Sequence, residues 1–199
     1  TLRARCHGIA DNKPLLIFGG CLVLFHLANG AMLPLMASVV TMRSREWATV
    51  LIAACIVAPQ LLVALLSPWI GRQAEKWGRW PLLLAGFGAL AIRGLFFIFV
   101  TSPYLLVPVQ LLDGVSAAVM GVMLPLVVAD TTRGTGHFNA ALGVVGTAGA
   151  IGASLSTTLA GYVSDSFGSA AAFCCLAAVA AASALMLAGF MPETRPPTN

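Results

Sequence analysis

Long apolar runs separated by short polar segments dominate the sequence. Six of these runs contain about 20 mostly apolar residues, the length that an α-helix needs to cross the hydrocarbon core of a bilayer. Asn29, Gly30 and several prolines interrupt them, which membrane helices tolerate where neighbours or water satisfy the freed backbone groups. The pattern predicts an all-α integral membrane protein, with a six-helix transmembrane bundle at 14–191 between an N-terminal segment (1–13) and a C-terminal tail (192–199). The predicted spans are 14–40, 48–70, 81–101, 104–129, 138–163 and 169–191.

The composition argues against a water-soluble protein. Of the 199 residues, 59% are hydrophobic and only 9% are charged, whereas a soluble domain carries roughly a quarter charged residues. The five cysteines form no Cys-x-x-Cys pair, so we expect neither disulfides nor a zinc site. Walker, His-x-x-Glu-His and paired-carboxylate patterns are absent from the sequence, and Ser116 lacks the second glycine of the Gly-x-Ser-Gly protease motif. We therefore expect no enzyme, no metal and no cofactor.

Lysine and arginine are distributed unequally between the two sides of the predicted bundle. Eight of the eleven fall on the side of the termini, two fall on the other side, and Arg93 lies inside a span. Because cytoplasmic loops carry such an excess of basic residues, we expect both termini in the cytoplasm of a plasma-membrane protein, in the inner membrane of a bacterium. The net charge of +4 then belongs to the loops, and no nucleic-acid partner is expected. The eight are Arg3, Arg5, Lys13, Arg72, Lys76, Arg79, Arg133 and Arg195, and the two are Arg43 and Arg45.

A short motif occurs twice, after the second and the fifth span. The segments 71–78 and 161–168 both read Gly-x-x-x-acid-x-aromatic-Gly. Each follows the second helix of a three-helix set, and the two lie on opposite faces of the membrane. This arrangement is typical of the 3+3 inverted repeats of membrane transporters.

Three segments resemble motifs of the major facilitator superfamily of transporters. Residues 71–80 are similar to its signature loop, Gly-x-x-x-(Asp/Glu)-(Arg/Lys)-x-Gly-(Arg/Lys)-(Arg/Lys), and depart from it at Trp80. Residues 110–118 resemble the fourth-helix motif Arg-x-x-Gln-Gly-x-Gly-Ala-Ala, with departures at Gln110, Asp113 and Ser116. The segment 192–195, Pro-Glu-Thr-Arg, resembles the Pro-Glu-Thr-Lys that closes many of these transporters. The residues that match the signature loop are Gly71, Glu75, Lys76, Gly78 and Arg79.

The resemblance implies the carboxyl-terminal six helices of a twelve-helix transporter. Six helices enclose only half of a cavity in this family, so we expect a partner in addition to the lipid bilayer and a small-molecule substrate. The partner is the N-terminal half, absent or supplied by another chain, or a second copy in a homodimer, because the two halves of the family share one orientation in the membrane.

Arg93, Asp113 and His26 are ionisable residues predicted at one depth, near the middle of the bilayer. Counting about 1.5 Å per residue, each lies roughly 14–18 Å from the start of its span. A charge there costs at least about 2.5–3.5 kcal/mol, and transporter sites lie at this depth. We hypothesise a polar cluster of the three that binds substrate or a proton; the alternative is a structural Arg93–Asp113 pair and a packing histidine. Asn29 and Gln110 share the helix faces of His26 and Asp113 and belong to the predicted site, although ordinary interhelical hydrogen bonds would also explain them.

The resemblance also implies a gate at the cytoplasmic end. Glu75 and Arg79 are four residues apart, and Asp130 lies at the end of the fourth span. In the family, an acid at this place often meets a basic residue of the signature loop. We expect an Arg79–Asp130 contact that forms in one access state and opens in the other; screened surface charges worth under about 1 kcal/mol are the alternative. The predicted gate residues are Gly71, Glu75, Lys76, Gly78, Arg79 and Asp130.

The fifth span has a glycine at every third position: Gly143, Gly146, Gly149 and Gly152. Small residues let membrane helices approach closely, so these four are predicted to line a packing groove. The spacing does not fit a phosphate-binding loop, and no strand precedes it.

Together these features predict a secondary active transporter, or half of one, that moves a small molecule by alternating access. Proton coupling is expected because His26 and Asp113 can titrate. Arg93 would suit an anionic substrate and an unpaired Asp113 a cationic one, so the substrate class stays open. The alternatives are a non-transporting, membrane-embedded interaction module or half-transporter subunit, and a channel-like pore.

Overall fold

The computed structural model describes residues 11–43, 47–100 and 102–196, which are almost entirely helical and contain no strand. Six segments are long and apolar enough to cross a membrane, which confirms the predicted all-α membrane fold. Arg3, Arg5 and Arg45 lie outside the described residues. The helices are α2 (Lys13–Asn29), α3 (Met32–Arg43), α4 (Ala48–Trp77), α5 (Trp80–Phe99), the 3-10 turn η1 (Pro103–Leu105), α6 (Leu106–Thr131), α7 (Phe138–Phe167) and α8 (Ser169–Phe190).

The helices α4 and α7 continue well beyond the predicted spans, to Trp77 and Phe167. The two copies of the repeated motif are therefore the last turns of these helices rather than loops. Each helix stops at a glycine with left-handed backbone, with φ of +96° at Gly78 and +88° at Gly168. Residues with a side chain adopt this conformation only at a cost, which explains why both copies end in glycine.

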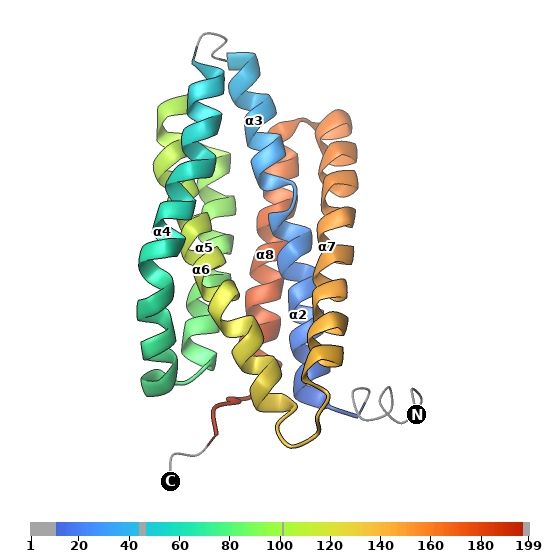
Figure 1. Ribbon diagram of the computed structural model, residues 1–199. Helices are drawn as coiled ribbons and strands as arrows, with labels where there is room; N and C mark the ends of the chain where they lie inside the picture. The colour runs from blue at the N-terminus through green and yellow to red at the C-terminus, as the bar shows by residue number, and fades with distance from the viewer. Residues whose placement is uncertain (1–10, 44–46, 101, 197–199) are drawn as a thin grey trace.

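The inverted repeat is visible in the course of the chain. In Figure 1, α4 runs toward the end of the bundle where the first and last described residues lie, which we call the terminal end, and α7 runs away from it. A shift of 90 residues places Ala48 on Phe138 and Trp77 on Phe167, so these two 30-residue helices coincide from end to end. Equivalent helices with opposite directions confirm the predicted 3+3 inverted repeat.

The two most extensive helix contacts are related by this repeat, because α2 packs on α7 and α4 packs on α6. A glycine lets the backbones approach at each crossing. A Cβ atom at Gly152 of α7 would collide with the backbone of Val23 and Leu27 in α2. One at Gly114 of α6 would lie 2.8 Å from the carbonyl oxygen of Pro59 in α4. Close approach of this kind gives membrane helices their van der Waals attraction.

The four glycines of the fifth span do not form one groove. Gly149 and Gly152 face α2, whereas Gly143 and Gly146 are exposed and an added Cβ would meet no described atom within 4 Å. Gly143 and Gly146 face away from α2, because three residues advance a helix by about 60° less than a full turn and the series rotates to the opposite side. The face that packs follows steps of three and four residues, with Ala141, Val145, Gly149, Gly152, Ser156 and Ala160 buried.

Replacing Gly152 with leucine is expected to lower the free energy of unfolding by roughly 3 kcal/mol, because the side chain can be accommodated only by separating α7 from α2. Gly146→Leu is the matched control and should change the stability by less than about 0.5 kcal/mol. Both can be measured by denaturant titration in detergent micelles, followed by circular dichroism. Equal effects of the two substitutions would contradict the helix contact described above.

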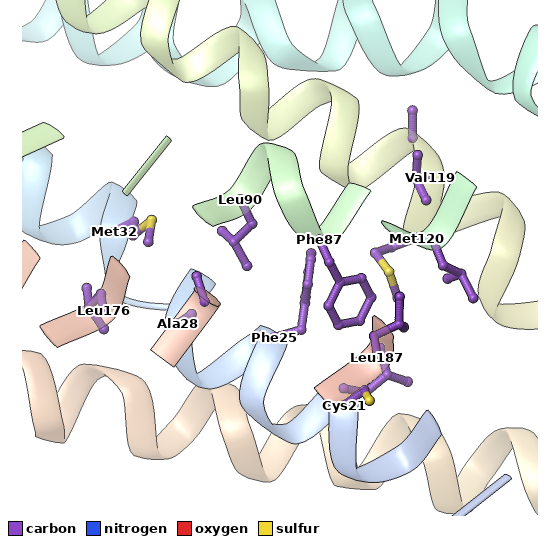
Figure 2. Packing of buried hydrophobic residues seen from close by; sticks show 14 of the residues in the cluster. Cys21, Phe25, Ala28, Met32, Phe87, Leu90, Val119, Met120, Leu176 and Leu187 are labelled. Atoms are coloured by element: carbon purple, nitrogen blue, oxygen red, sulfur yellow. The ribbon is translucent and has the colours of Figure 1, made fainter. Parts of the chain in front are cut away.

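The apolar core lies between α2, α5, α6 and α8 (Figure 2). The rings of Phe25 in α2 and Phe87 in α5 pack with 4.8 Å between their centroids. The buried Ser183 of α8 donates a hydrogen bond to the Cys21 carbonyl of α2 at 3.1 Å. Interhelical hydrogen bonds contribute about 0.6–2 kcal/mol in membranes. These contacts pack α5 and α8 against α2, and so position Arg93, the buried charged residue of α5.

Candidate functional site

The first membrane span is broken near its middle, where α2 ends at Asn29 and α3 begins at Met32. The break frees the backbone amide of Ala31, which donates to the Oγ atom of Ser156 in α7 at 2.8 Å. A broken helix within a membrane is tolerated only where protein or water satisfies its polar groups. Such discontinuous helices recur at the binding sites of transporters.

Arg93 of α5 lies beside this break and is 1% exposed. Its guanidinium donates to the carboxylate of Asp113 in α6 and to the side-chain oxygen of Asn29 in α2. The sulfur of Met32 lies 3.1 Å from Nη2, and the centre of the Phe97 ring lies 5.9 Å from the guanidinium carbon. One arginine thus links α2, α3, α5 and α6, and its buried charge is paired, because an unpaired cation would be very costly there.

A hollow of about 300 Å³ lies between the first span and α6, next to Arg93. The Asp113 side chain is 23% exposed there, whereas Arg93 is covered. The Oε1 atom of Gln110 is buried and has no hydrogen-bond partner among the described residues. A buried acceptor left unsatisfied costs about 1–3 kcal/mol, so this atom can accept a hydrogen bond from a ligand or from water. The lining residues are Asn29, Gly30, Leu33, Pro34, Arg93, Gln110 and Asp113.

His26 does not belong to this cluster, contrary to the prediction from depth. Its ring lies edge-on to Phe25, with 5.4 Å between centroids, and faces α7, where a Cβ atom at Gly149 would lie 2.8 Å from Cδ2 of the imidazole. Asn29, three residues later on the same helix, faces Arg93 instead. A three-residue step turns a side chain by about 60° around the helix axis, which is enough to direct the two toward different neighbours.

A second polar cluster surrounds Arg79, in the connection between α4 and α5 at the terminal end. Nε of Arg79 donates to Asp130 at 2.9 Å, and Nη1 donates to Glu75 at 2.9 Å and to the Ala74 carbonyl at 2.7 Å. The Arg79 and Asp130 side chains are only 4% and 6% exposed, so this is a buried ion pair rather than a screened one. Burial by itself lowers the pKa of Arg79, but the bonds to Asp130 and Glu75 outweigh it and raise the pKa above its usual value.

The other residues of the predicted gate belong to the last turns of α4 and to its end. Gly71 is in the last turns of α4 and faces Val122 of α6, Gly78 ends α4, and Lys76 is exposed. An added Cβ at Gly78 would collide with the carboxylate of Glu193. Glycine is therefore required at this position for its backbone conformation and also for space.

The segment after α8 completes this cluster. Glu193 accepts hydrogen bonds from the backbone amides of Arg79 and Trp80 at 2.8 and 3.1 Å, and so caps the N-terminus of α5. Arg195 donates to two carbonyls in the last turn of α4 at 2.9 and 2.8 Å. An acid at a helix N-terminus and a base at a C-terminus both complement the helix dipole. Sequence reasoning noticed this segment only through its resemblance to a closing motif and missed its capping role.

The stability that Glu193 provides is expected to depend on pH. Burial by itself raises the pKa of Glu193. The hydrogen bonds from the backbone amides of Arg79, Arg195, Trp80 and Thr194 outweigh this effect and bring the pKa below its ordinary value of 4.5. Because the pKa is lower in the folded chain, this stabilisation is present above pH 4.5 and is lost as the pH falls through the lowered pKa. The unfolding midpoints of the unaltered chain and of Glu193→Gln should therefore differ at pH 7 and converge at acidic pH. A constant difference would contradict the assignment.

The structure defines a multi-pass membrane protein with an inverted repeat and a polar cluster beside a broken helix. Residues 18–199 match the family model described as Major Facilitator Superfamily, and the chain belongs to this superfamily.

Two relatives, each named an uncharacterised MFS-type transporter, come from the CDC 1551 / Oshkosh and H37Rv strains of Mycobacterium tuberculosis. Each is 45% identical over 186 residues, which is 94% of this chain and 44% of the relative. The chain thus spans less than half the length of these relatives. No solved structure matches it.

Proposed function

We propose that the chain forms a six-helix half of a secondary active transporter that moves a small molecule by alternating access. The observation that carries the proposal is the hollow beside the break between α2 and α3, where Asp113 is partly exposed and Gln110 has an unpaired oxygen. Polar groups are costly in a membrane, and those that persist there line substrate or ion pathways. Membership of a superfamily whose relatives are named transporters supports the same function.

The other wall of the pathway would come from a second six-helix bundle. The hollow is bounded on one side by the first span and α6. The relatives are also more than twice as long as the region that matches this chain, which leaves room in them for a second bundle. We propose that this bundle is either a further half of the same protein or a second copy of this chain. A small solute and the surrounding lipid are the other partners.

The terminal end would face the cytoplasm of a bacterial plasma membrane. Six basic residues among those described belong to helix ends and connections at the terminal end: Lys13, Arg72, Lys76, Arg79, Arg133 and Arg195. A basic excess of this kind faces the cytoplasm in most membrane proteins.

The Arg79–Asp130 pair would help to close the terminal end of the transporter. The contact would form in one access state and open in the other. The pair joins the connection between α4 and α5 to the end of α6. Exchanging the charges, in Arg79→Asp with Asp130→Arg, should recover part of the transport that either single substitution removes. No recovery would count against a gating role.

The Asp113 carboxylate would couple the substrate to protons, since it is the partly exposed ionisable group of the hollow. In proteoliposomes, candidate solutes should move faster with an imposed proton gradient than without one. Asp113→Asn keeps an oxygen that can accept from Arg93 but removes the charge. It should slow transport by roughly 10- to 100-fold, the equivalent of one charge-assisted hydrogen bond.

Ser154→Ala is the control, because Ser154 is exposed on α7 and donates to its own helix at the Ala150 carbonyl. Transport by Asp113→Asn at the unaltered rate would remove Asp113 from the mechanism. A well-folded protein that moves no solute would instead support a non-transporting subunit.

A further inference from the structure

The hollow lined by Asn29, Arg93, Gln110 and Asp113 is here called the midplane hollow. It exposes the carboxylate of Asp113 rather than the guanidinium of Arg93. Arg93 is 1% exposed, and its two terminal nitrogens are directed toward Asp113, Asn29 and Met32. Asp113 accepts from Arg93 through Oδ1, while its side chain remains 23% exposed on the hollow. Arg93 also lines the hollow, and its Nε atom has no hydrogen-bond partner among the described residues but is buried. An entering anion would therefore meet the partly exposed carboxylate, while both terminal nitrogens of Arg93 are already engaged.

A second acceptor faces the same hollow. Gln110 is 1% exposed, and its Oε1 atom has no hydrogen-bond partner among the described residues. A buried acceptor is normally satisfied by a partner, by water or by a ligand. Asp113 and Gln110 lie three residues apart on α6, and both line this hollow, so a single N–H-bearing group that enters it can approach both side chains.

The nearest neighbouring hollow is also acidic. A neighbouring hollow of about 240 Å³ lies between α3 and α7, and the two hollows share Pro34. Its polar residues are Ser38, Thr157, Ser164 and Asp165, of which only Asp165 is charged. Clefts lined by one sign of charge attract solutes of the opposite sign. Arg93 and Asp113 offset each other, so Asp165 leaves the two hollows with a negative balance.

We propose that the midplane hollow binds a small organic cation that carries N–H groups, an amine, and that this is the substrate class of the transporter. The assignment rests on the proposed function. The ammonium group lies between the free oxygen of Asp113 and Oε1 of Gln110, while Arg93 keeps its bond to the other carboxylate oxygen. The hydrocarbon part of the amine packs on Leu33 and Pro34, and the charge of Asp165 in the neighbouring hollow attracts the cation to this region.

The test uses three probes of similar shape: phenethylamine, 3-phenylpropionate and 3-phenylpropan-1-ol. Methylamine and spermidine extend the amine series. Binding to the purified protein is measured by isothermal titration and by the shift of the unfolding midpoint. We expect the amines to bind and the carboxylate not to bind, with the alcohol at least tenfold weaker than phenethylamine.

Two variants connect binding to the hollow. Gln110→Leu leaves the Arg93–Asp113 pair intact and should weaken amine binding about tenfold without lowering the unfolding midpoint. Asp113→Asn should weaken amine binding by roughly 10- to 100-fold. Ser154→Ala, outside both hollows, should bind like the unaltered chain. Amine binding that is unchanged in Gln110→Leu and Asp113→Asn, or the absence of binding by every amine of the series, overturns the proposal.

Flux of the same probes in proteoliposomes separates this proposal from the proposed function. Movement of 3-phenylpropionate but of no amine would leave a transporter and overturn the cation site. Amine binding that depends on Asp113, with no probe crossing the membrane, would keep the cation site and overturn transport. Amine flux that is lost in Asp113→Asn supports both.

Discussion

An Asp113→Leu variant of this chain is expected to lose about 3–5 kcal/mol of folding free energy, the typical cost of breaking a buried ion pair by removing one partner. The substitution leaves the guanidinium of Arg93, which is 1% exposed, without a counter-charge inside the bundle. Arg93→Met should cost less, because Asp113 is 23% exposed on the hollow and water can solvate its carboxylate there.

The double variant Arg93→Met with Asp113→Leu should recover most of the stability lost in Asp113→Leu, because apolar residues often replace a buried ion pair without net cost. It should nevertheless bind no amine. The midpoint of unfolding in detergent, measured for the two single variants and the double variant, gives the coupling energy. Additive losses would mean that Arg93 and Asp113 do not act as a pair. Recovered stability together with retained transport would show that the pair only supports helix packing.

Arg79→Met is expected to destabilise the chain by a similar amount, about 3–5 kcal/mol. The change removes the three hydrogen bonds that Arg79 donates to Asp130, Glu75 and the Ala74 carbonyl. It also leaves the Asp130 side chain, 6% exposed, without its cation. For a chain of this length, the midpoint of thermal unfolding should fall by roughly 6–20 °C.

Arg72→Met is the matched control for this prediction. Arg72 is exposed in the last turns of α4, close to Arg79 in the sequence, and the substitution is chemically identical. Its effect should stay within about 0.5 kcal/mol. If both variants unfold at the same midpoint, the connection between α4 and α5 is not held by the Arg79 network.

The six spans, the inverted repeat and the superfamily were predictable because each depends on residues close together in the sequence. About 20 apolar residues in a row require a membrane whatever lies beside them. The repeated glycines after the second and fifth spans mark the same left-handed helix end, at Gly78 and Gly168. The spans predicted from hydropathy end earlier than the helices α4 and α7, because the last turns of both helices are polar and lack the apolar residues that mark a span.

Counting residues along a span predicts a depth in the membrane, but it does not predict the side of the helix on which each side chain faces. Counting residues placed His26 beside Arg93 and Asp113, whereas packing turned His26 toward α7 and Asn29 toward Arg93. The glycine series of α7 fails for the same reason, since only Gly149 and Gly152 meet α2.

Sequence alone therefore determined that this chain is a six-span membrane protein of one superfamily, and it singled out the polar residues of the spans as candidates for one site. The tertiary structure decided which of them touch, and it revealed Glu193 and Arg195 as caps on α5 and α4. The physical reason is that hydropathy reports how deep a residue lies along the helix axis. Rotation about that axis is set by the close packing of neighbouring helices, through contacts between residues far apart in the chain.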